Sequence, residues 1–250
     1  MRTRPTRHAL ITLFCLPSLA LGQETNGVAF TLGVGAQSQP EYFGAENSRV
    51  GPTGSFELER LKLGSFNLGG QDSYGFGFGG SFRFIGPREA DDYPELDGLD
   101  DVDLAVEVGG GLEFNTPDYE VFAKLRYGVI GHEALVAEFG GDVFYRPTDQ
   151  VTLSAGPRVL WGSDEFTQTY FGVTEAESVT SGFDAFAPDA GIVSAGVAAE
   201  AKYQFNETWG VTGKMRYDRL RDDAAESPIT QSEDQLTGSL VLTRRISLGF

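Results

Sequence analysis

The sequence predicts an all-β fold: a transmembrane, antiparallel, up-and-down β-barrel of about ten strands, with short helical turns in its outer loops. Three observations predict it. The chain opens with an export signal, ten later segments alternate between apolar and polar residues, and short turns alternate with long polar loops. A chain of 250 residues could hold two domains, but long β-barrels reach this size as one domain.

The first residues are predicted to be a signal peptide, residues 1–22. A basic start, MRTRPTRH, precedes the apolar run ALITLFCLPSLALG, whose last three residues have the small-x-small pattern of a cleavage site. We expect cleavage near Gly22, which leaves residues 23–250 as one outer-membrane β-barrel domain.

Cys15 is the one cysteine of the chain and lies inside this segment. We interpret it as an apolar residue that is removed with the signal peptide, because a lipid-modified cysteine requires small residues before it and Phe14 is large. The mature chain then has no cysteine and depends on no disulfide.

The charge balance is strongly acidic, with a formal net charge of −17. Loss of Arg2, Arg4 and Arg7 with the signal peptide leaves 16 basic against 36 acidic residues, a net charge of −20. This balance argues against nucleic acid as a partner, because nucleic-acid binding requires a basic surface. After residue 22 no run of about 20 apolar residues occurs, so no helical membrane span is expected.

Ten segments show the period of two that is typical of strands. In the last one, Leu236, Leu240 and Leu242 share one face, and Thr237 and Ser239 lie on the other. The predicted strands are about 10–14 residues long, whereas soluble strands usually have about 5–6 and tilted membrane strands need about 9–11. In chain order they are expected near 28–37, 50–59, 74–84, 102–114, 119–129, 134–146, 150–162, 189–205, 209–217 and 234–250.

The connections support a barrel that crosses the outer membrane. Tight turns at 115–118, 146–150 and 206–208 alternate with long polar loops near 38–49, 85–101, 163–188 and 220–233. Short turns on the periplasmic side and long loops outside are typical of outer-membrane barrels. The segment Arg60–Asp72 could hold an additional strand, so twelve strands is the alternative count.

Two outer loops are predicted to contain a short helix. Thr174 and Glu177 form the capping-box pattern, and Gly182 is placed to end a helix over about 175–181. A second helical turn is expected at Asp222–Glu226. The loop 163–188 either folds into the barrel mouth or packs as an ordinary outer loop, and the sequence leaves both open.

Charged residues occur in mid-strand on the predicted lumen face. They either line a narrow pore or pair with one another to satisfy the interior. About eight strands leave a lumen just filled by side chains and open porins use about 16–18, so ten strands argue against a wide pore. The residues expected to face the lumen are Glu107, Glu113, Arg126, Glu138, Arg158, Lys202 and Arg216.

Residue types that carry chemistry are scarce. His132, the one histidine after residue 22, is expected in a solvent-exposed Gly-His-Glu turn. The acidic loop near 85–101 lacks the spacing of a calcium-binding EF-hand and is interpreted as a solvated loop. No catalytic residue, metal ligand or cofactor is predicted, and we expect no enzymatic activity.

The end of the chain is similar to the C-terminal strand signature that the barrel-assembly machinery reads in Gram-negative outer-membrane proteins. Its residues are Ile246, Leu248 and Phe250, at alternate positions.

Several motifs resemble the MipA/OmpV family of outer-membrane proteins. The most specific is YFGVT followed by SG, made of Tyr170, Phe171, Gly172, Val173, Thr174, Ser181 and Gly182. Others are PEYFG at 40–44, LDDVD at 99–103, NETW at 206–209 and the block from Arg219-Leu220 through Ser227-Pro228. Asp222-Asp223 and Phe186 depart from the family pattern, in which Gly-Asp and Tyr are expected.

The resemblance implies a non-enzymatic barrel in the cell outer membrane. For its best-known member it implies tethering of a lytic transglycosylase and a bifunctional murein synthase. The leading hypothesis is therefore a scaffold for murein enzymes, and the alternative is a narrow channel for small solutes. The expected partners also include outer-membrane lipid, lipopolysaccharide and, during biogenesis, the barrel-assembly machinery.

Overall fold

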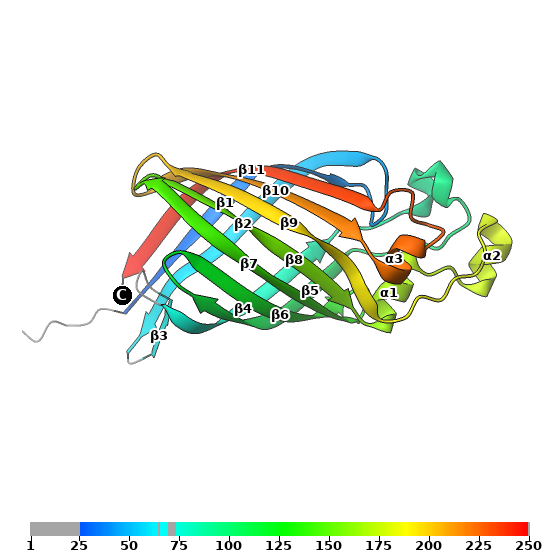
Figure 1. Cartoon of the computed structure of the whole chain (residues 1–250), viewed down its shortest axis with the longest axis horizontal. Coiled ribbons are helices and arrows are strands. Elements are labelled where there is room, and N and C mark those ends of the chain that lie inside the picture. Colours follow the sequence, from blue (N-terminus) through cyan, green and yellow to red (C-terminus); the bar gives the residue numbers. More distant parts are fainter. Residues whose placement is uncertain (1–25, 65, 70–73, 250) are drawn as a thin grey trace, which may run out of the picture.

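Antiparallel strands form one sheet that curls into a barrel (Figure 1). The computed structural model describes residues 26–64, 66–69 and 74–249, so the predicted signal peptide and Phe250 lie outside the described residues. The order of the 11 strands is β3-β2-β1-β11-β10-β9-β8-β7-β6-β5-β4. Their bounds are Gly27–Pro40 (β1), Ser48–Leu63 (β2), Phe66–Gly69 (β3), Gly75–Ile85 (β4), Ala105–Asn115 (β5), Tyr119–Ile130 (β6), Leu135–Thr148 (β7), Val151–Gly162 (β8), Gly191–Gln204 (β9), Trp209–Leu220 (β10) and Asp234–Gly249 (β11).

The ten long strands predicted from the period of two are confirmed. The ambiguous segment Arg60–Asp72 is divided: its first residues extend β2 to Leu63, and the four-residue β3 pairs back with Arg60–Leu63. β3 is thus a short hairpin partner of β2 and not a strand that crosses the barrel wall. Apart from the β1–β11 pair, strands that are hydrogen-bonded neighbours in the sheet are consecutive in the chain, which is the up-and-down arrangement.

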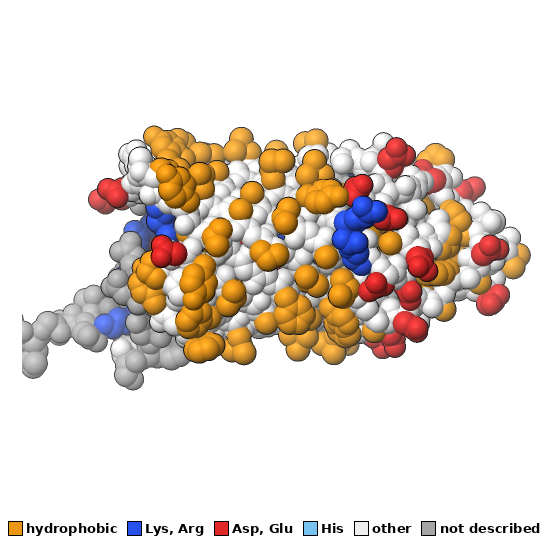
Figure 2. Space-filling view, in the orientation of Figure 1, with side chains coloured by type: hydrophobic (Ala, Val, Ile, Leu, Met, Phe, Trp, Pro, Cys, Tyr) orange, Lys and Arg blue, Asp and Glu red, His pale blue; other side chains and the backbone are white. Residues whose placement is uncertain are grey.

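The outer wall of the barrel is apolar. Exposed phenylalanines at 76, 78, 82 and 84 share one face of β4 and alternate with glycines, Ser81 and Arg83. Exposed leucines, valines and tyrosines cover the other long strands in the same alternation. Figure 2 shows these hydrophobic side chains along the wall and acidic ones at the end that carries the helices. An outward apolar face of this length matches the lipid-facing band of a membrane barrel.

The two ends of the barrel differ. Short turns, β3 and the C-terminal end of β11 lie at one end, and the helices and long loops lie at the other (Figure 1). We refer to these as the turn end and the loop end. Among residues 26–64, 66–69 and 74–249, no helix is both long and apolar enough to span a membrane.

The loop end carries three α-helices and two short 3-10 turns, at Ala90–Asp92 and Pro94–Leu96. Two of the helices, α2 (Glu175–Ser181) and α3 (Asp222–Glu226), confirm the predicted helical turns. The third, α1 (Asp164–Phe171), was not predicted.

The loops at this end pack as a lid with its own hydrophobic clusters. The inner cluster joins α1 and α3 to the strand ends and contains Phe166, Phe171, Val136 and Leu220, all nearly inaccessible. The outer cluster contains Tyr42, Leu96, Leu99, Val173 and Ile229, and so joins four different loops. Because burial of each such side chain stabilises by about 1.5–3 kcal/mol, these clusters hold the lid together.

One seam in the wall is not closed by strand pairing. β2 pairs with β1 over its whole length and with β3 only at Arg60–Leu63, and β4 pairs with β5. Within the described residues no ladder joins β2 to β4, although Nη2 of Arg49 near the start of β2 reaches Gly86, just after the end of β4.

Candidate functional site

The loop-end half of the lumen is centred on Glu107, a fully buried carboxylate on β5. Arg83 on β4 donates to it from Nε at 2.9 Å, and Arg126 on β6 donates from Nε at 2.8 Å. Nε2 of His132 lies 3.2 Å from Oε1 of Glu107. A buried charge is tolerated only when partners compensate it, and Glu107 has three.

The network continues across the lumen through Glu138 on β7. Arg126 Nη1 donates to Oε2 of Glu138 at 3.0 Å, and Arg216 Nη1 on β10 donates to its Oε1 at 2.7 Å. β8 and β9 lie between β7 and β10 in the sheet, so this contact is possible only across the inside of the barrel. Arg216 also binds Asp218 on its own strand. The side chains of five strands, β4, β5, β6, β7 and β10, therefore link across this part of the lumen.

Two of the other predicted lumen charges, Arg158 and Lys202, form ion pairs nearer the turn end. Arg158 forms a two-pronged bond to Asp142, with Nη2 at 2.9 and 2.7 Å from the two carboxylate oxygens. Lys202 contacts Glu57 on β2 at 3.1 Å and Glu200 at 3.3 Å. Glu113 pairs in register with Gly77, whose missing side chain leaves room for the carboxylate.

The prediction that His132 is a solvent-exposed turn residue is wrong. Its side chain is buried, with Nδ1 accepting from the backbone N–H of Ala134 at 3.1 Å. Because Nδ1 accepts, Nε2 carries the proton and donates to Glu107. The ring also lies edge-on to Phe166, with the centroids 5.2 Å apart. The flanking glycine and glutamate are typical of a polar turn, but the His132 ring turns inward because it binds the buried carboxylate of Glu107.

Helix α1 closes the loop end of the lumen from inside. It begins after Ser163, and the negative charges of Asp164 and Glu165 in its first turn stabilise the positive end of the helix dipole. Phe166 and Tyr170, one turn apart, both point inward, with ring centroids 4.8 Å apart. The guanidinium of Arg83 lies 5.7 Å from the Phe166 ring. The Ser-Asp-Glu start and the four-residue aromatic spacing are the signals that could have predicted this helix.

Helix α2 projects away from the barrel, as Figure 1 shows. Its capping box is complete: Glu177 N–H donates to Thr174 Oγ1 at 3.2 Å, and Thr174 N–H donates to Glu177 at 2.8 Å. Gly182 ends it with φ of +80°, a left-handed conformation that favours glycine. None of its residues is buried. The family-motif loop thus has two roles: Tyr170 and Phe171 plug the mouth, while the segment after Thr174 faces outward.

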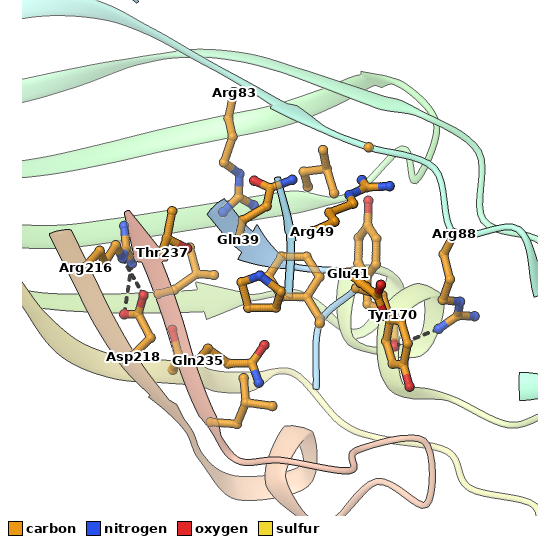
Figure 3. Close-up of a pocket in the computed structure, with 18 of the residues that line it drawn as sticks. Gln39, Glu41, Arg49, Arg83, Arg88, Tyr170, Arg216, Asp218, Gln235 and Thr237 are labelled. Carbon is orange, nitrogen blue, oxygen red and sulfur yellow. Dashed lines mark hydrogen bonds and ion pairs between the residues drawn. The ribbon is translucent and has the colours of Figure 1, made fainter. Parts of the chain in front are cut away.

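A cavity of about 240 Å³ remains beneath the lid (Figure 3). Its apolar lining includes Phe43, Phe84 and Leu160, and its charged lining includes Arg49 and Arg88. The other lining residues named in Figure 3 are Gln39, Glu41, Arg83, Tyr170, Arg216, Asp218, Gln235 and Thr237.

Two polar groups of this lining are buried without a partner in the described structure: Nε of Arg88 and the hydroxyl of Tyr170. Arg88 is 5% exposed and makes one side-chain bond, from Nη1 to the Tyr170 carbonyl at 3.2 Å. Burial lowers the pKa of Arg88 and raises that of the Tyr170 hydroxyl. Unpaired buried donors are costly, so these two mark a place where a ligand atom would be stabilising.

The acidic loop near 85–101 has structural bonds. Asp101 accepts from the backbone N–H of Ala90 at 2.7 Å, and Glu95 accepts from the Tyr42 hydroxyl at 3.2 Å. In the part of the chain that the structure describes, no group of three or more His, Cys, Asp or Glu side chains is arranged to hold a metal ion.

Comparison with known proteins places the chain in a family. The family described as MltA-interacting protein MipA matches residues 32–246, which is most of the barrel. The chain belongs to the MipA family. With the lipid-facing wall described above, this makes it an outer-membrane β-barrel protein.

Individual relatives match more narrowly. The MltA-interacting proteins of Escherichia coli (strain K12) and Shigella flexneri are each 35% identical over 86 residues, which is 34% of this chain and 34% of theirs. Only about a third of these MipA relatives is therefore spanned by the alignment. Among solved structures, an outer-membrane channel from Pseudomonas putida F1 has 8% identity and a TM-score of 0.46, covering 88% of this chain and 96% of that one.

Proposed function

We propose that this MipA-family protein is a non-enzymatic, non-conducting barrel that tethers a murein enzyme to the outer membrane. The observation that carries the proposal is the loop-end half of the lumen, where the Glu107 network and α1 occupy the space around the cavity beneath the lid. If the lumen does not conduct solutes, the protein must act through residues on its surface. The relatives are called MltA-interacting proteins, and this name is the basis for proposing MltA as the partner.

The turn end is the surface that such a partner would meet. It faces the periplasm if the termini do, and most of its turns are short, so the β2–β3 hairpin is its main projection (Figure 1). Leu63 ends β2 on this hairpin and is 46% exposed. We take Leu63 as the anchor of the tether, because a protein partner that buries an exposed apolar side chain removes it from water.

Co-purification from solubilised envelopes tests the tether. We expect the wild-type barrel to retain MltA and Leu63→Glu to retain much less. Val179→Glu is the matched control, because Val179 is 86% exposed on α2 at the opposite end. Failure of the wild type to retain MltA, or equal retention by both variants, contradicts the proposal.

A narrow channel for small solutes is the second candidate. The cavity of about 240 Å³ beneath the lid favours it, because it is an open space within the lumen. Conductance measurements separate the candidates: stepwise currents that disappear when residues 163–188 are deleted would favour the channel.

A further inference from the structure

The cavity beneath the lid is lined by residues from both sides of the unpaired seam between β2 and β4. Arg83 and Ile85 point inward on β4, whereas Phe84 between them is 67% exposed on the lipid-facing side, yet both sides of the strand line the cavity. Arg49 of β2 lines it from across the seam. The cavity therefore lies at the loop end of the seam, next to the edge of β4.

The sequences of the two seam strands suit unpaired edges. β2 contains Gly51-Pro52, and proline lacks the N–H that a central strand would donate. β4 is rich in glycine, and an added Cβ at Gly79 or Gly80 would meet no atom within 4 Å. β3 covers the seam only beside Arg60–Leu63. An unpaired backbone N–H or C=O group in contact with hydrocarbon is unfavourable by several kcal/mol. A polar or amphipathic molecule bound at the seam would therefore be stabilising.

Two arginines, Arg49 and Arg88, line the cavity at the seam. Among the described residues the Arg49 guanidinium forms no ion pair or hydrogen bond, and its Nη2 lies so close to Gly86 that a Cβ there would collide with it. Arg49 thus reaches from β2 to the end of β4. Arg88 is nearly inaccessible, has an unpaired Nε and donates to the Tyr170 carbonyl. The Tyr170 hydroxyl is also buried and unpaired. Glu41, also in the lining, offsets one of these two positive charges.

The size and polarity of the cavity define the ligand class. Its volume of about 240 Å³ is below the roughly 300–1,000 Å³ of pockets that enclose drug-sized ligands. A head group and the first few carbons fit, and a longer chain must leave through the seam. The seam is flanked by the phenylalanines of β4 and by Val50 and Phe56 of β2, which suit an acyl chain.

We propose that the β2–β4 seam is a lateral binding site for a single-chain amphiphile with a carboxylate or phosphate head group, taken from the membrane. Arg49 contacts the head group at the seam, Arg88 and the Tyr170 hydroxyl hold it in the cavity, and the chain lies between β2 and β4. This site is independent of the turn-end surface that would bind MltA.

Titration of the refolded full barrel in neutral detergent tests the site, with dodecanoate and dodecyl phosphate as probes. We expect Arg49→Gln and Arg88→Gln to weaken binding by about tenfold or more, because each removes a charged donor to the anion. Arg146→Gln is the matched control, since Arg146 lies on the exposed turn end. Unchanged affinity in both seam variants overturns the proposal.

A second pair of variants keeps the test independent of any lid defect. An added Cβ at Gly51, two residues from Arg49 on β2, meets no atom within 4 Å, so Gly51→Phe adds bulk beside the seam and should weaken binding by about tenfold or more. Gly213→Phe on β10 is its control, because the nearest atom to an added Cβ is 3.8 Å away. Binding to Gly51→Phe as tight as to the wild type contradicts the seam as the site.

Probe chemistry separates the possible sources of the ligand. Dodecanol of equal affinity would show an apolar groove without anion recognition, and inorganic phosphate of equal affinity would show a site for soluble anions; either result overturns the proposal. A photoreactive dodecanoate in vesicles should label β2 and β4 selectively. Even labelling around the lipid-facing wall would also refute it.

Discussion

Replacing Glu107 with glutamine removes the charge that organises the loop-end half of the lumen. Glu107 is fully buried and accepts bonds from Arg83, Arg126 and His132. Removing one partner of a buried ion pair destabilises by about 3–5 kcal/mol, because the remaining charge is left uncompensated. Arg126 keeps Glu138, which places our expectation near the lower limit, about 3 kcal/mol.

Urea unfolding of the refolded barrel in lipid vesicles measures this loss. With a slope of about 2 kcal/mol/M, a loss of about 3 kcal/mol lowers the unfolding midpoint by about 1.5 M. Glu57→Gln is the control, since Glu57 is 60% exposed in the lumen and its partner Lys202 keeps Glu200. We expect the control to lose less than about 1 kcal/mol. Equal losses in the two variants would refute the view that Glu107 is the hub of the network.

Three further changes probe the lid. Phe166→Ala should destabilise the barrel by about 3–5 kcal/mol, because it empties a fully buried aromatic site; a loss under about 1 kcal/mol in the same urea assay would show that α1 does not plug the mouth. Thr174→Ala should cost α2 about 1 kcal/mol of local stability, seen as faster amide exchange over 175–181 with the strands unchanged; unaltered exchange would contradict the capping box. Burial disfavours ionised Glu177, but the N–H groups of Asp100 and Thr174 outweigh it and hold its pKa below the usual value. The stabilisation of α2 by ionised Glu177 is therefore complete above the ordinary glutamate pKa and is lost as pH falls through the lowered pKa of Glu177. The amides of α2 should then exchange faster in acid than at neutral pH, after correction for intrinsic exchange. Glu177→Gln should remove this pH dependence.

The strands and two helices were predictable because their causes are local. The period of two along each long segment reflects one face toward lipid and one toward the lumen, and a strand cannot change it without exposing polar groups to hydrocarbon. The capping box at Thr174 and the stop at Gly182 are likewise set by neighbours in sequence. These features therefore appear in the structure where the pattern placed them.

The missed features depend on distant residues. His132 is buried because Glu107 on another hairpin binds its ring, and nothing in Gly-His-Glu indicates that partner. Helix α1 folds inward because Phe166 packs on His132 and under Arg83. The unpaired seam arises from the meeting of the first and last edges of the sheet, which a strand pattern does not describe.

Single-channel recording of the full-length mature barrel in planar bilayers tests the central claim most directly. The Glu107 network and α1 fill the loop-end half of the lumen, so the wild type should give no stepwise current across a range of voltages. Removal of the plug by deletion of residues 163–188 should produce steps and thereby prove that the barrels inserted. Stable stepwise currents through the wild type would contradict a closed barrel.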